Sequence, residues 1–163
     1  MRAARAARAC CVAALALVLA APGAAPALGH AQTQASGLRG AIASALHGRS
    51  LRFNRAESAV SDANARLRGE CAGVQGAGGD VTAVLSFLAL SDEALAEAVS
   101  TEADAATQFA AVPDAPDRRA AFAAARETAR RAVGHLRNAR QLTLRAAAEL
   151  TRVCEGLRAG SAP

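Results

Sequence analysis

Residues 118–157 read RRAAFAAARETARRAVGHLRNARQLTLRAAAELTRVCEGL. Apolar or small residues recur along this stretch at alternating spacings of three and four, the repeat of one helix face in heptad register. The members of this stripe are Phe122, Ala125, Ala129, Ala132, Leu136, Ala139, Thr143, Ala146, Leu150, Val153 and Leu157. The pattern predicts one long helix over about 116–158. Its start is marked by the acidic turn at 114–117, with Pro116 near the first helical position.

Two further segments, about 36–72 and 80–111, are also rich in helix-forming residues and carry similar stripes. A glycine cluster at 73–79 separates them, and short connections make consecutive helices antiparallel. The sequence therefore predicts an all-α fold, an up-down-up three-helix bundle with long alanine-rich helices. We expect a single domain over residues 32–158, followed by a disordered tail at 159–163.

The stripes of these two segments are interrupted in two places. The first stripe slips around Gly48 and Arg49, where we expect a kink or a later helix start at Ser50. In the second segment Ser91 and Asp92 stand within an otherwise apolar pattern, so this segment is either one helix or two.

The N-terminus has the order of residues that is typical of a secretory signal peptide. Three arginines precede a short apolar run at 10–21, and small residues follow up to Ala31. The run is shorter than the roughly 20 residues that span a membrane. We expect residues 1–31 to be cleaved after Ala31, or alternatively after Ala27, and the protein to be secreted, periplasmic or at the cell surface, without a membrane span.

Removing this leader changes the charge. It holds three arginines and no acidic residue, so the formal net charge of +5 falls to +2. This modest charge gives no indication of specific binding to nucleic acid.

Two cysteines, Cys71 and Cys154, remain after the leader. The up-down-up topology puts both at the same end of the bundle and at a similar height. In an exported chain this placement predicts an intrachain disulfide that staples the first helix to the third. The alternatives are a catalytic thiol, a metal ligand or an intermolecular bridge, but no CxxC spacing or adjacent histidine favours them.

Catalysis and cofactor binding find little support in the sequence. Lysine, tyrosine and tryptophan are absent, and His47 and His135 are predicted to lie on the surface, apart from each other. No nucleophile elbow, zinc-binding motif, haem motif or phosphate-binding loop occurs. We therefore expect a protein that is not an enzyme and that binds no cofactor or metal.

Five arginines of the third segment form a candidate anion-binding stripe. Four of them fall within about 40° on the helix, and the fifth flanks them. The stripe comprises Arg119, Arg126, Arg130, Arg137 and Arg140. It could bind a polyanion, an acidic protein or the anionic headgroups of a membrane surface. The alternative is an ordinary solvated face.

The stretch VTAVLSFLAL, residues 81–90, is apolar on nearly every side. Phe87 and Leu90 point away from the stripe of this helix, so they are candidates for contact with a protein partner, a second copy in a homodimer, or lipid. The alternative is that Val74 and the glycine loop, or the N-terminal residues, cover them.

These observations predict an exported, non-enzymatic helical-bundle protein that binds an unidentified protein partner or a polyanion. The alternative function is a module of a cell-surface coat or receptor, in which the bundle serves as a helical spacer.

Overall fold

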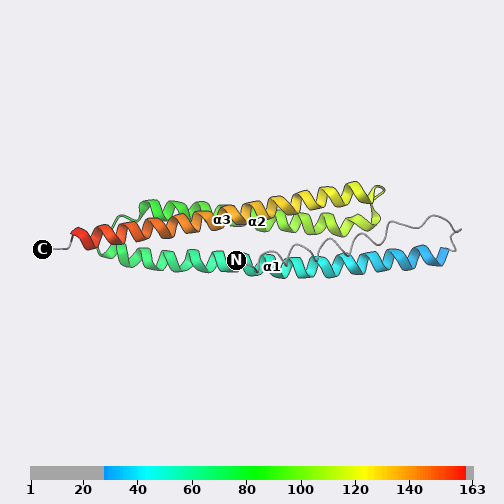
Figure 1. The fold of residues 1–163 in the computed structure, drawn as a ribbon, viewed down its shortest axis with the longest axis horizontal. Helices are drawn as coiled ribbons and strands as arrows, with labels where there is room; N and C mark the ends of the chain where they lie inside the picture. Colours follow the sequence, from blue (N-terminus) through cyan, green and yellow to red (C-terminus); the bar gives the residue numbers. More distant parts are fainter. Residues whose placement is uncertain (1–27, 161–163) are drawn as a thin grey trace, which may run out of the picture. The chain divides into compact units, whose positions relative to one another are not determined.

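The computed structural model of the chain describes residues 28–160, and they are almost entirely helical (Figure 1). The helices are α1 (Leu28–Gly76), α2 (Thr82–Ala111) and α3 (Arg118–Gly160), and a single 3-10 turn, η3 (Val112–Asp114), precedes α3. No strand occurs in this part of the chain. The predicted all-α class is confirmed.

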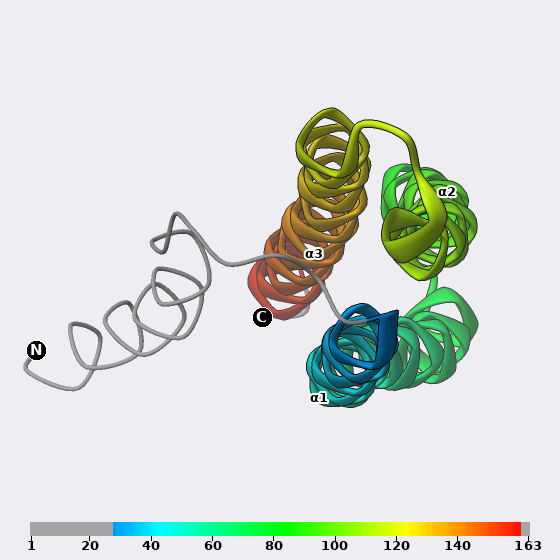
Figure 2. The same cartoon turned by 90° about the vertical axis from the view of Figure 1, so that its right-hand side faces the viewer.

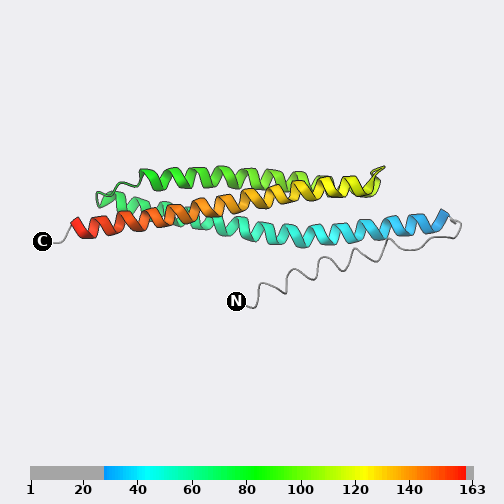
Figure 3. The same ribbon diagram turned by 45° about the horizontal axis from the view of Figure 1, so that its top comes forward.

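The described residues from Ala35 onward form one compact unit. Within it the three helices lie side by side, and a view along them shows a triangular arrangement (Figure 2). Consecutive helices run in opposite directions, so α1 and α3 are parallel and α2 is antiparallel to both (Figure 3). The up-down-up arrangement follows from the short connections, as expected.

The core consists of three clusters along the bundle, and their composition changes along it. The cluster nearest the α1–α2 loop holds the largest fully buried apolar side chains, Leu88 and Val84; its members are Cys71, Val81, Val84, Leu88, Ala146 and Leu150. The next two depend more on alanine; they contain Val60, Ala94, Leu95 and Ala139, and then Phe53, Ala98 and Ala132. Alanine lets the helices approach closely but buries little apolar area per residue.

Acidic residues mark the starts of α2 and α3, as the sequence predicts. The Asp80 carboxylate accepts the backbone N–H of Thr82 at 3.0 Å, and this hydrogen bond lowers the pKa of Asp80. Asp117 accepts the backbone N–H of Ala120 at 2.9 Å, which is the usual N-cap arrangement.

A buried polar network joins the three helices at the interruption of the α2 stripe. Asn64 of α1 donates to Ser91 Oγ at 3.0 Å and to Asp92 Oδ1 at 2.8 Å. Thr143 of α3 donates to Asn64 Oδ1 at 2.7 Å, and Ser91 Oγ donates to the Ala139 carbonyl at 3.0 Å. Within the described residues no buried side-chain polar atom lacks a partner.

The interruptions predicted from the sequence do not break the helices. Helix α2 is continuous through Ser91 and Asp92 because both side chains bond to the neighbouring helices. Helix α1 is likewise continuous through Gly48 and Arg49, where the arginine side chain reaches Glu102 of α2. The late start at Ser50 was therefore wrong, and of the two arrangements left open for the second segment the structure shows the single continuous helix.

The ends of the helices differ from the predicted ends by a few residues. Helix α1 begins at Leu28, before the predicted start at 36 and before the predicted cleavage site after Ala31. Helix α3 continues to Gly160, into the segment expected to be a disordered tail. Residues 1–27 and 161–163 lie outside the described residues, so the signal peptide stays a prediction.

The loop between α1 and α2 closes tightly over the end of the bundle at Gly79. A Cβ atom added to Gly79 would lie 2.6 Å from Val74 Cγ1, 3.0 Å from Val153 Cγ1 and 3.1 Å from a Leu157 methyl group. No room exists for a side chain there, whereas Gly69 of α1 has nothing within 4 Å of such an atom.

We expect Gly79→Ala to lower the free energy of unfolding by about 1–3 kcal/mol, because the added methyl group overpacks this contact. Gly69→Ala is the matched control and should raise stability by about 0.5–1 kcal/mol, because alanine replaces glycine inside an exposed helix. Chemical denaturation of both variants measures the two effects, and equal effects of the same sign would contradict the tight contact at Gly79.

Candidate functional site

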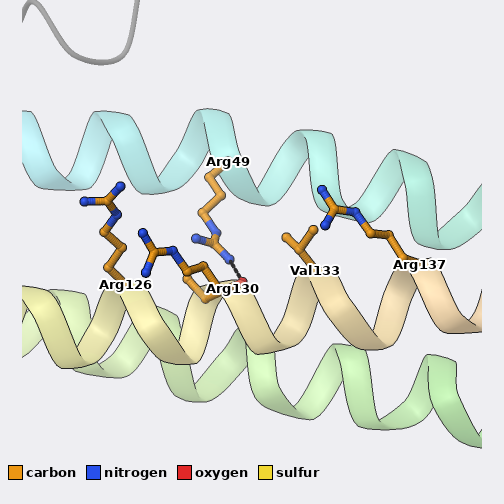
Figure 4. Close-up of a pocket in the computed structure, with 6 residues that line it drawn as sticks. Arg49, Arg126, Arg130, Val133 and Arg137 are labelled. Atoms are coloured by element: carbon orange, nitrogen blue, oxygen red, sulfur yellow. Dashed lines mark hydrogen bonds between the residues drawn. The ribbon is translucent and has the colours of Figure 1, made fainter. Parts of the chain in front are cut away.

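Arginines of α1 and α3 surround an open groove with a volume of about 320 Å³ (Figure 4). The residues that line it are Arg49, Arg126, Ala129, Arg130, Val133 and Arg137. The spacing of four, three and four residues from Arg126 to Arg137 keeps the α3 members on one face of the helix. Their guanidinium groups are exposed to solvent around the groove.

Arg49 stands on the α1 side of the groove and is held by both other helices. Its Nε donates to Glu102 Oε1 at 2.8 Å, a second ion-pair contact joins Arg49 Nη2 to Glu102 Oε2, and Nη2 also donates to the Ala129 carbonyl at 3.1 Å. Glu102 is buried, so this pair fixes the position of Arg49 and neutralises its charge.

The α3 arginines keep most of their charge available for a ligand. Arg130 pairs with Glu127 at 3.0 Å, but both side chains are more than 60% exposed, and such pairs are weak. Arg126 and Arg137 form no ion pair with any residue that the structure describes. The groove therefore has a net positive charge.

This arrangement is suited to holding anions. Guanidinium groups donate paired hydrogen bonds to carboxylate, phosphate and sulfate groups, and they stay protonated at neutral pH. They are therefore poor at transferring protons, and the lining residues offer no other titratable or nucleophilic group.

Only part of the predicted arginine stripe lies at the groove. Arg126, Arg130 and Arg137 lie at the groove, whereas Arg119 and Arg140 are exposed on α3 but do not line it. Arg49 was not predicted as a site residue, because its contribution depends on how α1 packs against α3. The slip of the α1 stripe at Gly48 and Arg49 was the available sign of it.

The two residues of the other candidate contact, Phe87 and Leu90, also differ from each other in their burial. Phe87 is half-buried and packs against the cluster nearest the α1–α2 loop, together with Val74. It therefore contributes to the packing of the bundle itself. Leu90 is 48% exposed.

Cys71 and Cys154 are free thiols in the structure, which does not show the predicted disulfide. Both belong to the same cluster at the α1–α2 loop; Cys71 is buried and Cys154 is half-buried. Burial raises the pKa of the Cys71 thiol, and the nearby carboxylate of Glu70 raises it further. The predicted proximity of the two cysteines is therefore present, but the bond is not.

The two histidines are placed apart. His47 is exposed on α1, and His135 Nδ1 of α3 lies 2.8 Å from Glu97 Oε2 of α2. Within the described residues no group of three or more His, Cys, Asp or Glu side chains is placed to hold a metal ion.

No known protein family, curated protein or solved structure matches the chain. Among the described helices, none combines the length and the apolar character that crossing a membrane requires.

Proposed function

We propose that this chain is an exported, non-enzymatic protein that binds an anionic ligand through the groove between α1 and α3. The observation that supports the proposal is the placement of Arg126, Arg130 and Arg137 around one groove, two of them without an ion pair in the described part of the chain. Arg49, fixed by Glu102, borders the same groove from α1.

Binding of this kind depends on several weak contacts that act together. A single exposed ion pair contributes about 0.2–1 kcal/mol, and salt screens it. A ligand that carries several anionic groups can form one such contact with each of the three arginines on this helix face. The ligand class is therefore a molecule with repeated negative charges rather than a single small anion.

Replacing Arg126, Arg130 and Arg137 together with glutamine should abolish most binding to heparin, used as a polyanion probe. Each lost contact should also reduce the slope of log affinity against log salt by about 0.7–0.9, so the slope should fall by about 2.1–2.7. Glutamine preserves helix propensity, and circular dichroism should show an unchanged bundle. Binding is measured by isothermal calorimetry over a series of salt concentrations.

The control carries the same charge change on another face of α3. Arg131, Arg145 and Arg152 do not line the groove, and their replacement with glutamine should leave most of the binding intact. Equal losses in the two triple variants would show that total charge, rather than the groove, determines binding.

The proposed export has a consequence for the two thiols. We propose that Cys71 and Cys154 form a disulfide in an oxidising compartment, losing two protons and two electrons to a disulfide donor that is reduced to two thiols. Their shared cluster at one end of the bundle supports this proposal. The bond would join α1 to α3 where the loop closes.

Protein recovered from the periplasm or medium should contain no titratable thiol when it is denatured without reductant, and two after reduction. In Cys154→Ser, the thiol of Cys71 should react slowly with alkylating reagents in the folded protein, because burial raises its pKa and limits access. Two free thiols in the unreduced exported protein would contradict the staple.

A further inference from the structure

The acidic and basic residues of the bundle are distributed unequally between the helices. Helix α2 contains five acidic residues and no basic residue, whereas α3 contains ten arginines and three glutamates. On α2, Glu102 is buried against Arg49. The other four acidic residues, Asp92, Glu93, Glu97 and Asp104, are exposed.

Three of these carboxylates repeat the spacing of the groove arginines. Glu93, Glu97 and Asp104 follow one another at steps of four and seven residues, as do Arg126, Arg130 and Arg137. On a helix these steps correspond to rises of about 6 and 10.5 Å and keep each triplet within about 40°. The seven-residue step also has a corresponding intermediate position in each helix, Ser100 in α2 and Val133 in α3.

We propose that the arginine groove of one copy of this chain receives the outer face of α2 from a second copy. With the two helices parallel, Glu93 lies level with Arg126, and the other two pairs are Glu97 with Arg130 and Asp104 with Arg137. An antiparallel α2 would leave the middle carboxylate three residues away from the middle arginine. The small side chains of Ala96, Ser100 and Ala103, all exposed, let this face approach closely.

Two of these residues form ion pairs within the chain, and intermolecular ion pairs can replace these. Glu97 contacts His135, and Arg130 contacts Glu127, but each of these four side chains is more than one third exposed. Exposed pairs contribute little to stability, so an intermolecular pair can replace them at small cost. This inference rests on the proposed function of the groove, and it identifies the ligand of the groove as α2 of a second copy.

The contact does not close on itself. In the triangular arrangement α1 and α3 lie next to each other and α2 lies beside both (Figure 2), and the residues that line the groove belong to α1 and α3 alone. Each copy can therefore use its groove and its α2 face at the same time, with different neighbours. Such a head-to-tail contact joins more than two copies, in an open chain or a ring, rather than closing as a dimer.

Charge reversal tests the pairing. One variant carries Arg126→Glu, Arg130→Glu and Arg137→Glu; the other carries Glu93→Arg, Glu97→Arg and Asp104→Arg. At low salt the sedimentation coefficient of the unmodified protein should increase with concentration without a plateau at the dimer, and high salt should abolish the increase. Each variant alone should associate at least tenfold more weakly, and an equimolar mixture should recover association.

A matched control separates the pairing from total charge. Arg131→Glu, Arg145→Glu and Arg152→Glu together change the net charge as much as the groove reversal does, yet they should preserve self-association. Circular dichroism shows whether each variant is folded. If a charge-reversed variant unfolds, the milder variant with glutamine at Arg126, Arg130 and Arg137 replaces it, and it should also weaken association.

Two results would overturn the inference: an unmodified protein that stays monomeric at low salt and high concentration, or a mixture of the two reversed variants that does not associate. If the monomeric protein still bound heparin through Arg126, Arg130 and Arg137, the proposed function would stand and only its occupant would be wrong. If neither heparin binding nor self-association depended on these arginines, both proposals would fail.

Discussion

Replacing Leu88 with alanine should lower the free energy of unfolding by about 3–5 kcal/mol. Leu88 of α2 is fully buried, and its cluster includes Cys71 of α1 and Leu150 of α3. Truncation removes apolar contacts with both neighbouring helices and leaves a cavity between them. Chemical denaturation monitored by circular dichroism measures the loss.

The expected cost is large because the rest of the core is thin. The other two clusters rely on alanines such as Ala98, Ala132 and Ala139. Alanine contributes little area to be buried, so a large share of the apolar stabilisation comes from the cluster that contains Leu88. The helices there are already held apart by Val84 and Leu150, which limits collapse around the cavity.

Leu85→Ala is the matched control for this prediction. Leu85 lies three residues earlier on the same helix but is 41% exposed. Its truncation should change stability by less than about 1 kcal/mol. A similar loss in both variants would show that the α2 helix, rather than the buried cluster, determines the effect.

The fold was predictable because its information is local to each helix. The stripe from Phe122 to Leu157 reports one face of one helix, and the acidic residues before α2 and α3 report their starts. The interruptions were ambiguous in the sequence because polar residues in a stripe can either break a helix or bond to a neighbour. Ser91 does the latter, and its partners Asn64 and Thr143 lie on two other helices.

The site was predictable only in part, for a similar physical reason. Arg126, Arg130 and Arg137 share a face of α3, so their spacing alone brings them together. The participation of Arg49 and the half-burial of Phe87 depend on the packing of separate helices, which a helical repeat does not specify. The same limit applies to the thiols of Cys71 and Cys154, whose proximity follows from topology but whose bond depends on an oxidant.

The Asn64 side chain lies at the centre of the polar network. Its replacement with aspartate should have the second large effect on the stability of the protein. Asn64 is 1% exposed, and its Nδ2 lies 2.8 Å from Asp92 Oδ1. In Asn64→Asp, a carboxylate would replace the amide donor and face a second carboxylate. Burial and this like charge both disfavour ionisation, so the pKa of the introduced group should lie well above its usual range.

Asn64→Asp should therefore reduce stability at pH 7 by about 3–5 kcal/mol, and the loss should depend on pH. In the unfolded chain the new carboxyl group ionises near pH 4, whereas in the bundle it stays protonated to a higher pH. The loss of stability should increase as the pH rises from the unfolded pKa to the folded pKa. It should decrease again as the pH falls from the folded pKa toward the unfolded pKa.

Two further variants isolate the charge from the lost hydrogen bonds. Asn64→Ala removes the bonds to Ser91, Asp92 and Thr143 without adding a charge, so its cost of about 1–3 kcal/mol should show no added pH dependence. Asn54→Asp places the same carboxylate at an exposed position of α1 and should change stability by less than about 0.5 kcal/mol. Urea denaturation from pH 4 to pH 8 compares the three. A stability of Asn64→Asp that runs parallel to that of Asn64→Ala over this range would mean that water or rearrangement solvates position 64, and that the network is not the closed, buried centre of the bundle.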